Sequence, residues 1–195
     1  MKKILILGSS NTDMTVKTPT LPAPGETVLG GVFTMSAGGK GANQAVAAKR
    51  VGGDVSFICK VGNDVFGDNS IKHYEAEGID VSGIIRSDKP SGVALITVDN
   101  DAENCIVVAS GANLDFTDAD IKASEEALRS CDVLLMQLEI PVPAVLQAAR
   151  IAHEAGAFVV LNPAPYAELP EEIFKYISLF IPNETELASF SGMPV

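Results

Sequence analysis

The sequence has 195 residues, of which 47% are hydrophobic, so it can bury a substantial core and is expected to form one main domain. Asp and Glu number 25 against 14 Lys and Arg, a formal net charge of -11, and the lack of a basic cluster argues against nucleic acids and anionic membranes as partners. Cys59, Cys105 and Cys131 form neither a disulfide framework nor a metal motif, and no stretch approaches transmembrane length, so we expect a cytoplasmic protein.

The first predicted element is a buried parallel strand over residues 4–7, a continuous apolar run that Gly8 ends. Asn11, Thr12 and Asp13 follow its carboxyl end, where open α/β sheets bind ligands. An amide beside a carboxylate suits paired hydroxyls, because the amide donates and the carboxylate accepts. These residue types also form ordinary turns, so the residues alone leave both interpretations open.

Residues 38–45 read Gly-Gly-Lys-Gly-Ala-Asn-Gln-Ala and open a predicted helix. Glycine allows close approach to a ligand, the first free N–H groups of a helix attract oxygen atoms, and Lys40 and Asn43 add donors. A Walker A loop is excluded because Gly41 follows the lysine. The dinucleotide fingerprint is excluded because Gln44 takes the third glycine position and no predicted strand runs directly into the turn. We predict a polar ligand site here, with a plain glycine-rich helix start as the alternative.

Strand and helix patterns then alternate along most of the chain, with short connections. This alternation predicts an α/β fold with a Rossmann-like, mostly parallel sheet covered by helices on both faces. The predicted strands cover residues 4–7, 55–59, 133–138, 157–161 and 179–182, and the predicted helices cover 38–51, 66–77, 142–155 and 184–190.

Two β-rich stretches, residues 27–36 and 92–108, break this alternation. Residues 99–101 read Asp-Asn-Asp and predict a hairpin turn inside the second stretch. The two stretches predict a separate small sheet; an antiparallel edge of the main sheet is the alternative.

Glu139 follows the predicted strand over 133–138 and precedes Pro141, so we expect it at the same sheet edge as Asp13, as a third hydroxyl acceptor. A carboxylate that favours the start of a helix is the alternative for Glu139. Asn183 and Glu186 fit an N-cap and its capping box at the start of the last helix.

Five motifs together resemble the PfkB sugar-kinase family, and within it the ribokinases, over the whole length of the chain. They are Asn-Thr-Asp at 11–13, the double-glycine segment at 38–45, Gln-Leu-Glu at 137–139, Asn-Pro-Ala-Pro at 162–165 and Pro-Asn-Glu-Thr-Glu at 182–186. The resemblance implies a ribokinase-like fold and ATP-dependent phosphorylation of D-ribose to D-ribose 5-phosphate. It also implies that segments of about 14–36 and 92–110 form a β lid over the sugar, which also makes a homodimer contact.

The resemblance further implies roles for individual residues. Asn183 is expected to contact the nucleotide phosphates, and Glu186 to hold Mg²⁺ through water, in keeping with the oxygen ligands and retained waters of that ion. The residues implied in sugar binding are Asn11, Thr12, Asp13, Gly39, Lys40, Gly41, Ala42, Asn43 and Glu139.

Members of the resembled family carry a later Gly-Ala-Gly-Asp stretch with the catalytic aspartate, and a loop for a monovalent cation such as K⁺. Both are expected beyond Val195, so residues 1–195 are expected to be the N-terminal part of the domain, to contain no catalytic residue and to have negligible turnover alone. A kinase of another sugar or nucleoside, or a non-catalytic sugar-binding protein, are the alternatives.

Overall fold

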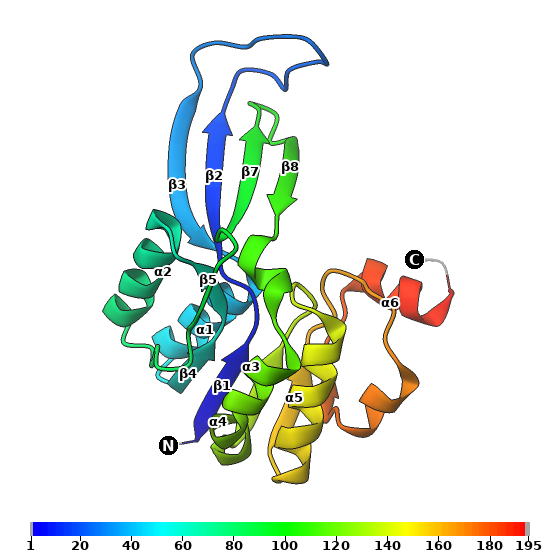
Figure 1. The fold of residues 1–195 in the computed structure, drawn as a ribbon. Helices are drawn as coiled ribbons and strands as arrows, with labels where there is room; N and C mark the ends of the chain where they lie inside the picture. The colour runs from blue at the N-terminus through cyan, green and yellow to red at the C-terminus, as the bar shows by residue number, and fades with distance from the viewer. Residues whose placement is uncertain (1, 194–195) are drawn as a thin grey trace.

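The computed structural model describes residues 2–193 and places a five-stranded parallel sheet in the body of the molecule (Figure 1). Its strand order is β11-β10-β9-β1-β4, and every neighbouring pair is parallel. The predicted parallel α/β fold is therefore confirmed. The five strands are β1 (Lys3–Leu7), β4 (Asp54–Ile58), β9 (Val133–Met136), β10 (Phe158–Leu161) and β11 (Leu179–Phe180).

Helices cover both faces of this sheet, as predicted. Side chains alternate along β1, so that Leu5 and Leu7 pack into one core cluster and Ile6 into the other. The first cluster lies beneath α5 (Val142–Glu154), α3 (Asp118–Ala123) and α4 (Glu125–Ser130), and the second beneath α1 (Lys40–Arg50) and α2 (Val65–Ala76).

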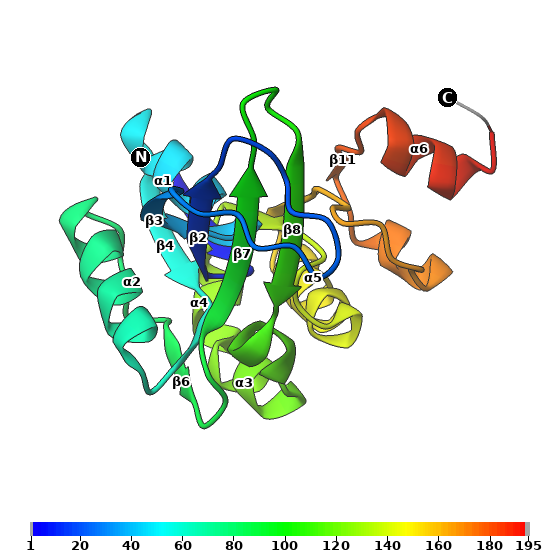
Figure 2. The same ribbon diagram turned by 90° about the horizontal axis from the view of Figure 1, so that it is seen from above.

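A separate four-stranded sheet, here called the small sheet, projects from the body (Figure 1). Its strand order is β3-β2-β7-β8, in which β2 is parallel to β7 and the two outer pairs are antiparallel. Seen from above, it lies between α2 on one side and α6 (Glu184–Ser191) on the other (Figure 2). Its strands are β2 (Asn11–Lys17), β3 (Val32–Gly38), β7 (Gly92–Val98) and β8 (Asn104–Ala109).

The two predicted β-rich stretches lie in the small sheet and not at an edge of the main sheet. The turn that was the alternative interpretation of residues 11–13 is not formed, because these residues open β2. Two details of the sequence prediction are wrong. Residues 27–31 are not a strand, because β3 begins only at Val32. A strand does run directly into the glycine turn, since Gly39 alone separates β3 from α1.

All four strands of the small sheet have one end at the body. At this base Asn11 is in register with Gly38 on one side and with Gly92 on the other. Only residues 8–10 connect β1 to β2. The base of the small sheet therefore lies against the carboxyl end of β1, where ligand sites of open α/β sheets occur.

Four short elements complete the described fold. The short strands β5 (Lys60–Gly62) and β6 (Ile85–Ser87) form a parallel pair. The 3-10 helix η1 (Gly111–Asp115) follows β8, and η2 (Glu171–Lys175) precedes β11.

Among residues 2–193, no helix combines the length and apolar character that crossing a membrane requires.

Candidate functional site

The start of α1 is packed against the β1–β2 connection so closely that only glycine fits at two positions. A Cβ at Gly39, whose φ is 91°, would lie 2.9 Å from the backbone nitrogen of Asn11. A Cβ at Gly41 would lie 2.6 Å from the backbone nitrogen of Ser9. These contacts bring the predicted segments 11–13 and 38–45 together at one place.

The first N–H groups of α1 are bonded within the protein, which corrects the expectation that they are free for a ligand. The N–H of Lys40 donates to Oε2 of Glu139 at 2.9 Å. The N–H of Gly41 donates to Oγ of Ser9 at 3.3 Å, and the N–H of Ala42 to the Ser9 carbonyl at 2.9 Å. A ligand at this end of α1 therefore finds these three N–H groups already occupied.

Glu139 reaches the site from the connection between β9 and α5. Its Oε2 accepts both the Lys40 N–H and the Ser9 hydroxyl, so it occupies the positive end of α1 rather than of its own following helix. Glu139 thus does lie at the start of a helix, as the alternative interpretation stated, but that helix is α1 and not α5, which follows it in the chain. No hydrogen bond among residues 2–193 uses Oε1 of Glu139, which leaves that oxygen for a ligand.

Asp13 lies above Gly38 in the neighbouring strand, and its carboxylate atoms would lie 2.2–2.3 Å from a Cβ at that position. Partial burial, and then the negative charge of Glu139, raise the pKa of the Asp13 carboxyl above its ordinary value. This electrostatic coupling supports the prediction that both carboxylates lie at one sheet edge. Two acceptors so placed suit a ligand that carries several hydroxyl groups.

Lys40 and Asn43 lie three residues apart on α1 and therefore share a face of the helix. Among the described residues, no ion pair involves the Lys40 ammonium and no side-chain hydrogen bond involves the Asn43 amide. Both side chains thus keep free donors in the first turn of α1, whose Lys40 N–H meets Glu139, and Asn43 also lines a cavity with His73.

Thr12 and Ala42 do not point their side chains into this site. Alternation along β2 places Thr12 on the face opposite Asn11 and Asp13, where it lines a cavity of about 360 Å³ together with Phe66 of α2. Ala42 is buried in the core beneath α1. Neither side chain can therefore contact a ligand that lies between the two carboxylates.

Asn183 and Glu186 form the capping box that the sequence predicts. The Asn183 side chain accepts the Glu186 N–H, and the Glu186 carboxylate accepts the Asn183 N–H, each at 2.8 Å. Residues 2–193 contain no group of three or more His, Cys, Asp or Glu side chains that could hold a metal ion. Any metal here would thus need ligands beyond Glu186.

Comparison with known proteins identifies the family. A family model described as "pfkB family carbohydrate kinase" matches residues 1–195. The chain belongs to the pfkB family of carbohydrate kinases. The architecture of a parallel sheet with a small mixed sheet is shared with solved members of that family.

Two curated relatives illustrate the similarity. The ribokinase of Haemophilus influenzae is 43% identical over 195 residues, which are 100% of this chain and 64% of the relative. The bifunctional ribokinase/ribose-5-phosphate isomerase A of Fructilactobacillus sanfranciscensis is 44% identical over 197 residues, 100% of this chain and 36% of the relative. This pfkB chain therefore spans less than two thirds of the length of these relatives.

Solved structures give the same result. The ribokinase from Giardia lamblia superposes with a TM-score of 0.87 at 33% identity, covering 99% of this chain and 61% of that one. The structure of Arabidopsis thaliana ribokinase complexed with ribose and ATP gives a TM-score of 0.88 at 30% identity, covering 99% of this chain and 64% of that one.

The sequence analysis assigned no role to several residues that the structure places at or near the candidate site. Ser9, which the sequence analysis did not single out, joins the start of α1 to Glu139. Gln44 donates through Nε2 to Oδ1 of Asn162 at 3.3 Å and accepts from Nε2 of Gln137, while Nδ2 of Asn162 donates to the Ile181 carbonyl at 2.9 Å. This chain of amides connects α1 to the segment before Asn183. Its sequence signal was that Gln44, Gln137 and Asn162 each lie in one of the recognised motifs.

Proposed function

We propose that the full-length protein is an ATP-dependent kinase that transfers the γ-phosphoryl group to the O5 hydroxyl of D-ribose. The observation that carries this proposal is the convergence of Asp13, Glu139 and the start of α1 at the base of the small sheet. The names of the related ribokinases and the ribose and ATP bound to the Arabidopsis protein support the choice of substrate and cofactor.

In this proposal Asp13 and Glu139 accept hydrogen bonds from sugar hydroxyls, and Asn11, Lys40 and Asn43 donate to them. The glycines at 39 and 41 contribute by letting α1 approach the β1–β2 connection. Hydrogen bonds that involve a charged group contribute about 1.5–3 kcal/mol each, so a sugar that lacks one hydroxyl leaves a costly unpaired carboxylate. Fixed positions of this kind supply most of what a phosphoryl transfer needs from the sugar half of a kinase.

The nucleotide phosphates are proposed to lie near Asn183. Its Oδ1 is used by the Glu186 N–H and the Thr185 hydroxyl, which leaves Nδ2 as a donor for a phosphate oxygen. Glu186 uses Oε2 in the capping box, so Oε1 is the atom that could serve Mg²⁺ directly or through water. This single carboxylate fits, because Mg²⁺ in kinases takes one or two carboxylates together with phosphates and waters, and the ion would neutralise phosphate charge.

The small sheet is proposed to cover the sugar and to provide the contact of a homodimer. Its exposed apolar side chains are the observation in favour: Val32, Phe33, Met35, Leu95, Ile106, Val107 and Val108. Exposed apolar side chains gathered on one element in this way are typical of protein contact surfaces.

A second sugar deserves a place in the test, because a deoxyribokinase of Salmonella typhimurium is 38% identical over 194 residues of this chain. Thermal unfolding of the full-length protein with D-ribose, 2-deoxy-D-ribose, fructose or adenosine compares the candidates directly. A ligand at about 100 times its Kd stabilises the folded state by about 2.7 kcal/mol. We expect the largest rise in Tm with ribose, and a rise with fructose or adenosine alone would contradict the proposal.

The nucleotide half is tested separately with Asn183→Asp. The carboxylate still accepts the Glu186 N–H, so helix capping is retained, but the Nδ2 donor is lost and a negative charge faces the phosphates. We expect the KM for ATP to rise about tenfold or more with little change in Tm, since a charged hydrogen bond is replaced by repulsion. An unchanged KM for ATP would remove Asn183 from the nucleotide site.

A further inference from the structure

Asn113 in η1 is a buried residue next to the site, and its side chain is only 1% exposed. Its Oδ1 accepts the N–H of Ser10 at 2.9 Å. Its Nδ2 donates to the Ser10 carbonyl at 3.2 Å and to Oδ1 of Asn11 at 2.7 Å. All of its contacts are thus to the two residues that lead into β2.

These contacts determine the orientation of both amides. A backbone N–H only donates, so the atom of Asn113 that faces the Ser10 N–H must be the oxygen. Its nitrogen then faces Asn11, and the atom of Asn11 that meets it must be an acceptor, which is Oδ1. The Nδ2 group of Asn11 is consequently turned away from Asn113, and no hydrogen bond among residues 2–193 uses it.

The fit around the two amides is close. A Cβ at Gly92, in register with Asn11 on the neighbouring strand, would lie 2.1 Å from Oδ1 of Asn11 and 2.3 Å from Nδ2 of Asn113. A Cβ at Gly111 would lie 2.2 Å from the Pro90 carbonyl, so the start of η1 is held equally closely. A side chain at either glycine would therefore displace the two amides or the backbone beside them, whereas the hydrogen bonds alone determine which way each amide faces.

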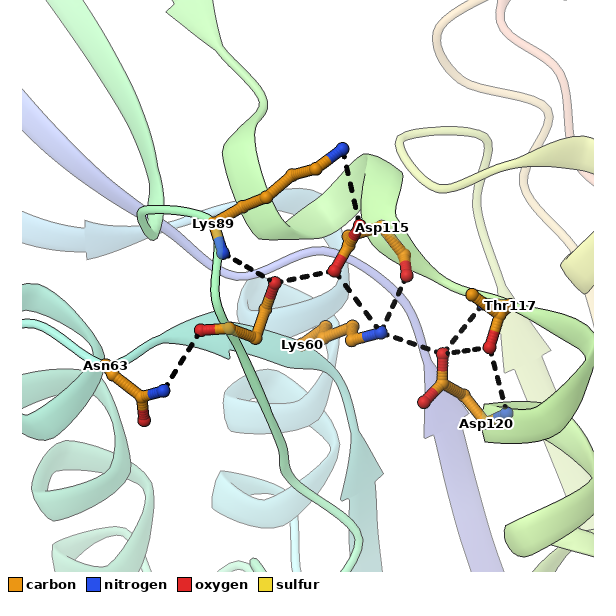
Figure 3. Close-up of polar contacts among 7 residues, drawn as sticks. Lys60, Asn63, Lys89, Asp115, Thr117 and Asp120 are labelled. Carbon is orange, nitrogen blue, oxygen red and sulfur yellow. Dashed lines mark hydrogen bonds and ion pairs between the residues drawn. The ribbon is translucent and has the colours of Figure 1, made fainter.

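The other end of η1 is anchored by the almost buried ammonium of Lys60 (Figure 3). Lys60 donates to the backbone carbonyl of Asp115 at 2.6 Å and pairs with the carboxylate of Asp120 at 2.8 Å. Asp115 also accepts the Ser87 hydroxyl at 2.6 Å, and its carboxylate lies 3.3 Å from the ammonium of Lys89. Asn113 is thus presented by an element that is bonded on both sides.

We propose that Asn113 is a positioning residue that makes Asn11 a donor only toward the sugar, which rests on the sugar-kinase function proposed above. Asn11 then offers N–H, and Asp13, as a carboxylate, offers only acceptors. One hydroxyl that contacts both residues must accept from Asn11 and donate to Asp13. A rotated Asn11 amide would set two acceptors against the same hydroxyl.

The test is Asn113→Asp, which keeps the shape of the side chain and removes the Nδ2 donor. One carboxylate oxygen still accepts the Ser10 N–H, but the other repels Oδ1 of Asn11, so the Asn11 amide rotates and presents its oxygen to the sugar. Steady-state kinetics of the full-length protein should show a KM for ribose raised about 10- to 100-fold, with the KM for ATP changed less than about twofold. Asn63→Asp is the matched control. Asn63 also donates one hydrogen bond, to the Ser87 carbonyl beside the Lys60 network (Figure 3), but its side chain makes no described hydrogen bond to Asn11.

A double-mutant cycle separates positioning from general packing. In an Asn11→Ala background, Asn113→Asp should change ribose affinity less than about twofold, because the group it orients is absent. Additive effects of the two changes would overturn the proposal. If Asn113→Asp does not fold, Gly92→Ala provides a second test, because the added methyl group disturbs the same Asn11–Asn113 contact from β7. It should likewise raise the KM for ribose and leave the KM for ATP almost unchanged.

The outcomes also distinguish this inference from the proposed function. A wild-type protein that binds ribose, together with an Asn113→Asp protein of unchanged KM for ribose, overturns the role of Asn113 alone. A wild-type protein that binds none of the sugars tested overturns both proposals.

Discussion

The carboxylate of Asp13 occupies the space that a side chain at position 38 would need. Gly38 has no positive φ, so its role is to leave room for a neighbour rather than to permit an unusual backbone. The overlapping atoms belong to the end of the Asp13 side chain, which can move at lower cost than backbone. An added methyl group is therefore expected to alter the site more than the fold.

Gly38→Ala should displace Asp13 and weaken ribose binding by about 1.5–3 kcal/mol, the contribution of one charged hydrogen bond. Calorimetric titration with ribose measures this change. Asp13→Ala should weaken binding by a similar amount, and the double variant should bind no worse than Asp13→Ala alone. Independent, additive losses would show that Gly38 acts through something other than Asp13.

Ribose affinity should fall in mildly acidic solution. Burial and the charge of Glu139 raise the pKa of Asp13, so this carboxyl takes up its proton at a higher pH than an ordinary aspartate and there loses the negative charge that strengthens the hydrogen bonds it accepts. The folded state binds the Asp13 proton more tightly than the unfolded chain does. The contribution of Asp13 to the free energy of unfolding therefore falls as pH rises from its unfolded pKa through its folded pKa. Asp13→Asn should therefore raise the Tm at neutral pH in the absence of sugar.

Titration of ribose affinity across the acid range gives the direct measurement. Glu139→Gln removes the second cause of the raised pKa, so the loss of affinity should move to lower pH, apart from any uniform weakening. A midpoint that stays at the same pH would assign the titration to another group.

At the scale of elements, the buried parts of the fold were predictable from the sequence because their apolar patterns are determined by burial alone. The runs that became β1, β9 and β10 are apolar and short, and α5 repeats buried alanines at helical spacing. Strand β2 was missed because it begins Asn-Thr-Asp, residues that are also typical of turns. Asn11 and Asp13 face the candidate site, so the side chains that suit a polar ligand also obscure the apolar pattern of a strand.

The candidate site was predicted in part for a similar reason. The resemblance supplied side chains such as Asp13 and Glu139, and the structure brings both to the start of α1. Sequence could not show that Glu139 fills the end of α1, because the bond joins residues 99 apart. It could not show the contact between Asn113 and Asn11 either, since these residues are 102 positions apart and carry no local signal of pairing.

The Lys60 network is expected to hold η1 and α3 in place. Burial alone would raise the pKa of Asp120, but hydrogen bonds from Lys60 and Thr117 hold it below its ordinary range. Lys60→Met should lower the free energy of unfolding by about 1–3 kcal/mol, less than for a fully buried pair because water reaches Asp120. Arg129→Met is the control; it removes an exposed pair with Glu125 that contributes about 0.3–0.5 kcal/mol.

The pH dependence of the stability lost in Lys60→Met tests whether the ion pair with Asp120 is the cause. A carboxylate with a lowered pKa stabilises the fold at neutral pH and ceases to do so as pH falls through its folded value. Denaturant unfolding should therefore show the largest difference between wild type and Lys60→Met at neutral pH, narrowing in acid. A difference that is independent of pH would point to lost packing of the lysine chain.

At the scale of the whole molecule, both faces of the small sheet carry exposed apolar side chains. Ile106 is in register with Ile96, and Ile96 with Thr15. Thr15 lies two residues after Asp13 in β2, so Ile106 and Asp13 are on the same face of the sheet. Leu95 lies on the opposite face, in register with Val107. Leu95 is 53% and Ile106 51% exposed, so either can be exchanged without disturbing a core.

We expect Leu95→Glu or Ile106→Glu to convert a dimer of the full-length protein into a monomer, because a charge desolvated in an apolar contact is costly. Sedimentation velocity measures the change, and the variant that dissociates identifies the face that pairs. Glu103→Gln, in the turn between β7 and β8, is a control that should not alter the mass. A wild-type monomer, or a dimer that survives both variants, would refute the contact.

The attachment of the small sheet at one end also makes it a lever. Strand β2 is 7 residues long, so about 20 Å separate its ends, and a tilt of about 10° at the base displaces the far end by about 3–4 Å. Cys105 lies near that far end and is exposed, whereas Cys59 is buried and burial raises the pKa of Cys131 to about 11. A thiol-reactive fluorophore would therefore attach to Cys105 before the other two cysteines, and its emission could report in real time how the sheet moves when a ligand enters at the base.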